Sequence, residues 1–308
     1  MRRAALFLLL VCSAGARAAP NDLQLWRLGS PDNFTVCTVC NGTDNTLVPG
    51  DPSAQTRFAR LTATLALAFA PAFEDAAQTT GQSGFELGFG TQVAYPRLSE
   101  QEWPSEGTLG TGAPPQALIL PTVTVRKGLG GSIELGVAAS MLVNSQIFAL
   151  GGQLRWAPLD GLYGWPDVAL RAWASHLIGV QDLNMTFGGA DILVSKSFGV
   201  AGTFRLQPYA QYGLTMVDAS TGAIDFNPSA ENPGNPSADD ASFHRLAFWE
   251  NRYHRFVAGV RLVGGRWLIG VEGGMAMGSN PVQHDNSSTA ATQFSRLWTT
   301  SAHLGLTF

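Results

Sequence analysis

The sequence has little charge, few cysteines and no long apolar runs. Only 14% of its 308 residues are charged, while 45% are hydrophobic; an average globular domain is about a quarter charged. The apolar content excludes an intrinsically disordered chain, and the scarcity of charge argues against a soluble domain. Beyond the first residues no run of 18 apolar residues occurs, which excludes a polytopic helical membrane protein.

Glycine is abundant instead, with 35 residues, and the apolar residues are spread along the chain rather than gathered in blocks. A chain of this composition can turn one half of its side chains towards lipid and the other half towards water. Because successive side chains of a strand point to opposite faces, the composition favours a β-barrel.

The first 18 residues have the pattern of a secretory signal peptide. Two arginines are followed by the apolar stretch 4–11, and Ala16-Arg17-Ala18 matches a cleavage site. Removal of this segment takes three arginines and no acidic residue, which leaves 16 basic against 23 acidic residues. We therefore expect export through the Sec pathway and no nucleic-acid partner.

Two cysteines remain in the exported chain, Cys37 and Cys40, in a polar stretch rich in Asn, Asp, Gly and Thr. Export places them in an oxidising compartment, where a disulfide is the expected state. A thioredoxin-type site needs this spacing at the start of a helix in a βαβ unit, and no such unit is indicated. Zinc would need further ligands, and no histidine precedes His176. We expect neither a metal nor a cofactor.

From residue 84 onward, apolar and small or polar residues alternate with a period of two. Gly, Pro, Asn and Asp interrupt the alternation at regular intervals. The pattern predicts about ten strands, at 82–97, 116–127, 131–143, 145–157, 166–178, 183–198, 202–217, 252–263, 266–278 and 293–308. In the sixth segment the apolar phase changes near Gly188 and Gly189, which predicts a β-bulge there.

The lengths of these segments and of their connections point to a transmembrane barrel. Most segments run 12 to 16 residues, whereas a tilted strand crosses a bilayer in about 9 to 11. Connections after the second, sixth and eighth segments are tight, and those after the first, seventh and ninth are long and polar. Bacterial outer-membrane barrels have short periplasmic turns and long extracellular loops, so both termini are expected in the periplasm.

Residues 52–70 fit two structures. Asp51 and Pro52 suit the start of a helix, and the apolar residues from Phe58 to Phe69 follow a helical spacing, but they also alternate. A helix leaves ten strands and a strand makes eleven, within a range of 8 to 12. We expect the helix, either inside the barrel as a plug or at its periplasmic rim. The predicted organisation is a signal peptide over 1–18, a periplasmic tail over 19–81 and a barrel over 82–308.

The last segment ends in Leu304, Leu306 and Phe308 at alternate positions. This ending resembles the signal by which outer-membrane β-barrel proteins of diderm bacteria are handed to their insertion machinery. The resemblance implies an all-β, antiparallel up-and-down barrel in the outer membrane, with membrane lipid and the insertion machinery as partners. It implies no particular activity, because barrels of this class serve many functions.

If the apolar face meets lipid, the opposite face lines the lumen. Eight charged residues fall on that face: Glu86, Arg126, Glu134, Arg155, Arg171, Arg205, Arg261 and Glu272. A ten-stranded barrel is narrow enough for such side chains to reach across it. They predict either a buried network of ion pairs that closes the channel, or a narrow polar pore for small solutes with a preference for anions.

Histidines and acids near the predicted outer rim raise an enzymatic alternative. A ten-stranded barrel with such a rim resembles the omptin surface proteases, in which a histidine and aspartates activate water. His254 and Asp240 are the candidates here, although no omptin motif is matched residue by residue. Acidic loop residues near them are expected to be solvated, because no calcium-binding spacing occurs. The favoured interpretation is a non-enzymatic barrel, a narrow porin-like channel or a structural barrel with acidic surface loops.

Overall fold

The computed structural model describes residues 19–39, 44–71, 76–161, 164–228, 237–249, 251–278 and 296–308. Ten antiparallel strands form a closed barrel: β3 (Phe85–Tyr95), β4 (Leu118–Leu129), β5 (Ile133–Met141), β6 (Phe148–Leu159), β7 (Asp167–Ile178), β8 (Leu183–Ser195), β10 (Phe204–Thr221), β13 (Arg252–Gly264), β14 (Trp267–Gly278) and β15 (Leu297–Thr307). Pairing of β15 with β3 and of β10 with β13 closes the sheet on itself. The predicted up-and-down barrel is confirmed.

Burial alternates along each barrel strand, as the period-two pattern predicts. Leu135 and Val137 of β5, for instance, are exposed, whereas Glu134 and Gly136, which alternate with them, are buried. The outer wall is thus covered with exposed apolar side chains and the inner wall carries small and polar ones. A short strand, β9 (Phe198–Val200), extends β10 beyond the barrel wall.

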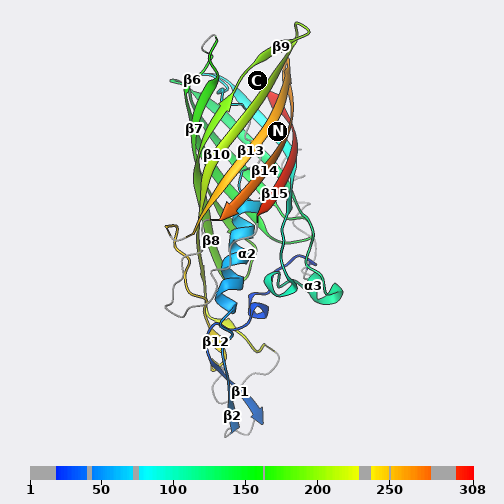
Figure 1. Ribbon diagram of the computed structural model, residues 1–308, viewed down its shortest axis with the longest axis vertical. Coiled ribbons are helices and arrows are strands. Elements are labelled where there is room, and N and C mark those ends of the chain that lie inside the picture. Colours follow the sequence, from blue (N-terminus) through cyan, green and yellow to red (C-terminus); the bar gives the residue numbers. More distant parts are fainter. Residues whose placement is uncertain are drawn as a thin grey trace, which may run out of the picture.

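The two ends of the barrel differ. At one end, which we call the short-turn end, lie the tight turns at 130–132 and 265–266 and the last residue, Phe308, whose backbone pairs with Phe85. At the opposite, long-connection end lie residues 96–117, which carry η3 (Glu100–Glu102) and α3 (Glu106–Thr111), and the connection that carries β11 (Ile224–Asp225) and β12 (Asp240–Ala241). Figure 1 shows the C-terminus at the upper end and α3 and β12 at the lower end.

The predicted helix is present as α2 (Ala54–Ala68). Every residue of its second half, from Leu61 to Ala68, is buried. A helix that is buried all round must be enclosed by other elements, and α2 contacts β3, β10 and β15. It projects from the barrel at the long-connection end (Figure 1). None of the described helices is long and apolar enough to cross a membrane.

The chain before α2 caps the long-connection end. It contains η2 (Leu25–Leu28) and a hairpin of β1 (Phe34–Val39) and β2 (Asp44–Val48). The backbone of Asn21 bonds to that of Asn144 in the connection between β5 and β6, and Leu23 bridges to Ser105 beside α3. From the sequence we expect this tail in the periplasm and the long connections outside. The structure puts both at the same end, so the two expectations cannot both hold.

The expected bulge at Gly188 and Gly189 is wrong. The register of β8 against β7 and β10 runs through both glycines without a shift. Met185 and Phe187 instead point inward on the same face as Asp191, and they belong to the apolar core around α2. The apolar phase changes because the inner wall changes character along the strand, not because the backbone does.

Candidate functional site: the lumen and the segment that crosses it

The lumen has an apolar half and a charged half. Towards the long-connection end, inward-facing residues form the core around α2: Ala94, Leu118, Leu120, Ala149, Leu177, Met185, Phe187, Val217, Ala219, Ala276 and Leu297. Towards the short-turn end the inner wall is charged, with Glu86, Arg126, Glu134, Arg155 and Arg171 all buried. This division explains the switch of phase in β8.

Residues 69–84 connect the two halves. The chain leaves α2 in the apolar half and reaches β3 at the short-turn end, so it has to run the length of the lumen. Gln92 donates to the carbonyl of Ala68 over 2.6 Å at the beginning of this path. Arg255 donates to the carbonyl of Pro71 over 3.2 Å next along it. Residues 72–75 lie outside the described residues.

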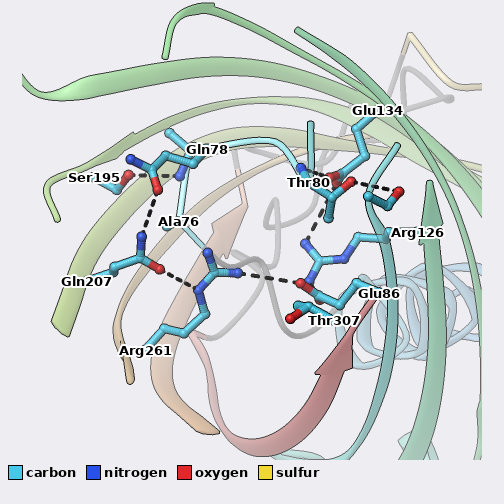
Figure 2. A network of polar contacts seen from close by, with 12 residues as sticks. Ala76, Gln78, Thr80, Glu86, Arg126, Glu134, Ser195, Gln207, Arg261 and Thr307 are labelled. Atoms are coloured by element: carbon cyan, nitrogen blue, oxygen red, sulfur yellow. Dashed lines mark hydrogen bonds and ion pairs between the residues drawn. The ribbon is translucent and has the colours of Figure 1, made fainter. Parts of the chain in front are cut away.

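In the charged half the barrel wall binds the backbone of this segment. Arg155 donates to the carbonyl of Ala76 over 3.3 Å, and the backbone N–H of Ala77 donates to Ser195 over 2.9 Å. Glu134 accepts from the backbone N–H of Thr80 over 3.0 Å. Buried backbone groups must find such partners, and Figure 2 shows the wall supplying them from several strands. We call residues 76–84 the luminal segment.

Side chains of the luminal segment add further bonds. Gln78 donates to Asp167 over 3.0 Å and accepts from Gln207 over 2.8 Å. Thr79 donates to Asp160 through both its backbone N–H and its hydroxyl, over 3.2 and 3.0 Å. A segment with this many wall contacts fills the lumen as part of the fold rather than crossing it loosely.

The charged wall residues also pair with one another. Arg126 pairs with Glu86 and lies 3.8 Å from Glu134, which is in turn 3.5 Å from Arg155. Arg261 lies 3.8 Å from Glu86 and donates to Gln207 over 2.8 Å. Buried charges are costly unless paired in this way, so the network and the segment that it binds depend on each other (Figure 2).

The eight predicted lumen residues therefore differ in how deeply they are buried. Six of them, Glu86, Arg126, Glu134, Arg155, Arg171 and Arg261, are buried in the network. Glu272 is half-buried and accepts from Tyr209 over 2.8 Å and from Ser301 over 2.7 Å. Arg205 is exposed at the short-turn rim, at the start of β10.

The sequence-based prediction missed Asp191, Asp167 and Arg255, which are all buried. Asp191 is buried and accepts two bonds from Arg171, over 3.0 and 2.5 Å. The change of phase in β8 already placed Asp191 between the apolar residues Ala190 and Ile192, on the inner face. This inward phase could have identified Asp191 as a lumen residue.

The two enzymatic candidates are not brought together. The side chain of His254 lies on the outer face of β13, where it hydrogen-bonds to Tyr212 over 2.8 Å and stacks on its ring. Asp240 lies in β12, next to Asp225 and Asp239. Within the described residues no hydrogen bond or ion pair joins His254 to a carboxylate. From the sequence these acidic loop residues are expected to be solvated; Asp240 is exposed, but Asp239 is buried.

The disulfide and export predictions are not tested. Residues 1–18 and Cys40 lie outside the described residues. Leu304 and Phe308 of the C-terminal motif are both exposed, Leu304 on the outer wall and Phe308 at the short-turn end. The role of this motif in membrane insertion stays a prediction.

Neither a protein-family model nor a characterised protein sequence matches the chain. Solved structures do match. The N-terminal β-barrel domain of Pseudomonas aeruginosa OprF is 10% identical, with 74% of this chain and 99% of that chain covered and a TM-score of 0.31. The outer membrane protease OmpT from Escherichia coli is 11% identical, with 77% and 100% covered and a TM-score of 0.38. The P. aeruginosa outer membrane protein OprG is 11% identical, with 76% and 99% covered and a TM-score of 0.29. These matches are all bacterial outer-membrane β-barrel proteins. At such scores the likeness carries no information on activity.

Proposed function

We propose that the protein is an outer-membrane β-barrel that is closed by its own N-terminal segment. The observation that carries the proposal is the bonding of the luminal segment to the barrel wall, with α2 filling the other half of the lumen. The protein is then a structural barrel rather than an open porin-like channel. It holds a cap, which residues 19–53 form at the long-connection end.

A membrane position is supported by the outer wall. Large apolar side chains are exposed on all ten strands, and a strand faces lipid with such a surface. Trp156, Trp165 and Trp267 are exposed near the short-turn end, where an aromatic girdle would meet the lipid interface. Trp103 and Tyr253, which the same argument assigns to the opposite girdle, are buried, and both belong to the core around α2.

The orientation follows from the connections. Short turns face the periplasm and long connections face outward in outer-membrane barrels, so the short-turn end and Phe308 are placed in the periplasm. The cap of residues 19–53 then lies on the cell surface with the long connections. This proposal replaces the expectation that the tail lies in the periplasm. Lipid and the barrel-insertion machinery remain the proposed partners.

Conductance across a planar bilayer tests the closure. The wild-type protein is expected to show no steady current. Leu65→Asp places a charge on the fully buried face of α2, and because a buried unpaired charge costs several kcal/mol, the helix is expected to leave the lumen and open a conducting state. Leu109→Asp is the matched control, because Leu109 of α3 is 63% exposed.

A large steady current through the wild-type protein would contradict the proposal. Heat-modifiable migration on gels shows that each variant retains a folded barrel, so a silent Leu65→Asp variant with a folded barrel would show that α2 does not close the lumen.

A further inference from the structure

A cavity of about 570 Å³ opens at the short-turn end, beneath the luminal segment. This volume lies within the range of small-molecule sites, about 300 to 1,000 Å³. Gln78, Thr79 and Thr80 of the luminal segment are half-buried and form part of its wall. Arg205, Arg266 and Phe308 are exposed at the short-turn end and form its mouth.

Cationic groups outnumber anionic ones around this cavity. Four arginines line it, namely Arg126, Arg205, Arg261 and Arg266, together with Glu86 and Glu134. Even with the α-carboxylate of Phe308 included, the arginines are in excess. The inner pair, Arg126 and Arg261, is already engaged with the two glutamates.

The outer pair of arginines has no such partner. Within the described residues no ion pair or side-chain hydrogen bond involves the guanidinium of Arg205 or of Arg266. They come from the start of β10 and from the turn between β13 and β14, two neighbouring strands. Each presents a planar set of donors that matches a carboxylate or a phosphate.

We propose that this cavity is a binding site for a soluble anion that carries phosphate or carboxylate groups. Arg205 and Arg266 bind the anionic groups at the mouth, and the polar side chains of Gln78, Thr79 and Thr80 contact the ligand from the wall of the cavity. The cavity lies inside the ring of strands, so the ligand comes from the aqueous phase and not from the lipid. The proposal does not depend on whether the barrel conducts ions.

Pyrophosphate and citrate are suitable probes, and glucose is the uncharged control. Titration calorimetry of the full-length protein in a zwitterionic detergent is expected to detect binding of at least one anion and none of glucose. Substitution of both arginines, Arg205→Gln with Arg266→Gln, is expected to weaken binding at least tenfold. Lys127→Gln is the control for charge, because Lys127 is exposed on the outer wall of β4 at the same end and its substitution removes one positive charge outside the cavity.

Two further results bear on the proposal. Arg205→Lys with Arg266→Lys keeps the charge but loses the planar donors, and an intermediate affinity is expected. Equal weakening in Lys127→Gln would show that only the general charge of this end matters and would overturn the site. Absence of binding by the wild-type protein to both anions would overturn it as well, and so would wild-type affinity in the folded double Gln variant.

Discussion

Single inward-facing glycines set how closely the chain packs inside the barrel. Gly213 and Gly270 illustrate it, since a Cβ at either position would overlap the side chain of Asp191 or of His303. The sequence revealed that glycine favours the inner phase, because alternation assigns each residue to a face. It did not reveal which side chain fills the space beside each glycine, since that neighbour lies on another strand or in the luminal segment.

Gly128 offers a test at this scale. A Cβ there would overlap the carbonyl oxygen of Gly81, in the luminal segment, and the backbone of Gly128 also donates to Gly84. Gly128→Ala is therefore expected to push the segment away from β4 and to lower the free energy of unfolding by about 1 to 3 kcal/mol. Denaturant unfolding of the refolded protein measures the change.

Gly130 provides the control for that substitution. It lies two residues further on, in the turn that follows β4, and a Cβ there meets nothing within 4 Å. Gly130→Ala is expected to unfold like the wild type. If the two variants were equally stable, the segment would not pack against β4 as described.

At the scale of elements, α2 joins the cap to the barrel. Arg57 near its start donates to the carbonyl of Leu28 over 2.8 and 2.6 Å and pairs with Asp51. Arg60 pairs with Glu102 of η3. Helical spacing predicted the element and nearly its bounds. It did not predict the end of the barrel at which the helix lies, because that depends on contacts with loops far away in sequence.

The cap should loosen in acid. Hydrogen bonds from Ser53 and Arg57 lower the pKa of Asp51 to about 2, from an ordinary value of 3.8. A carboxyl whose pKa is lower in the folded state stabilises that state fully above its unfolded pKa and loses the effect as pH falls through the folded value. We therefore expect protease susceptibility of the cap to rise between about pH 4 and pH 2, measured with an acid-active protease.

Asp51→Asn is the control for this transition. Asparagine keeps a hydrogen-bond acceptor but does not titrate, so the variant is expected to be more susceptible at neutral pH and to lack the Asp51 contribution to the acid-dependent rise. An unchanged pH profile in the variant would show that Asp51 does not govern the cap.

At the scale of the whole molecule, low charge and abundant glycine follow from one arrangement. The outer wall carries mostly apolar side chains, and the inner wall has room for few large side chains because the chain itself occupies the lumen. Strand number, strand alternation and the helix could be predicted from local periodicity. The filling of the lumen could not, since residues 76–84 show no periodicity and are held by partners that span more than a hundred positions.

The central claim is that the N-terminal segment crosses the barrel, with the cap at the surface and Phe308 in the periplasm. An epitope tag inserted beside Leu47, which is 65% exposed in the β1–β2 hairpin, tests it in intact cells. The same tag at Gly130 and Gly131, in the turn between β4 and β5, is the control for the opposite end. We predict antibody labelling of the first tag on intact cells and of the second only after permeabilisation. Labelling of the second tag alone on intact cells would contradict the account.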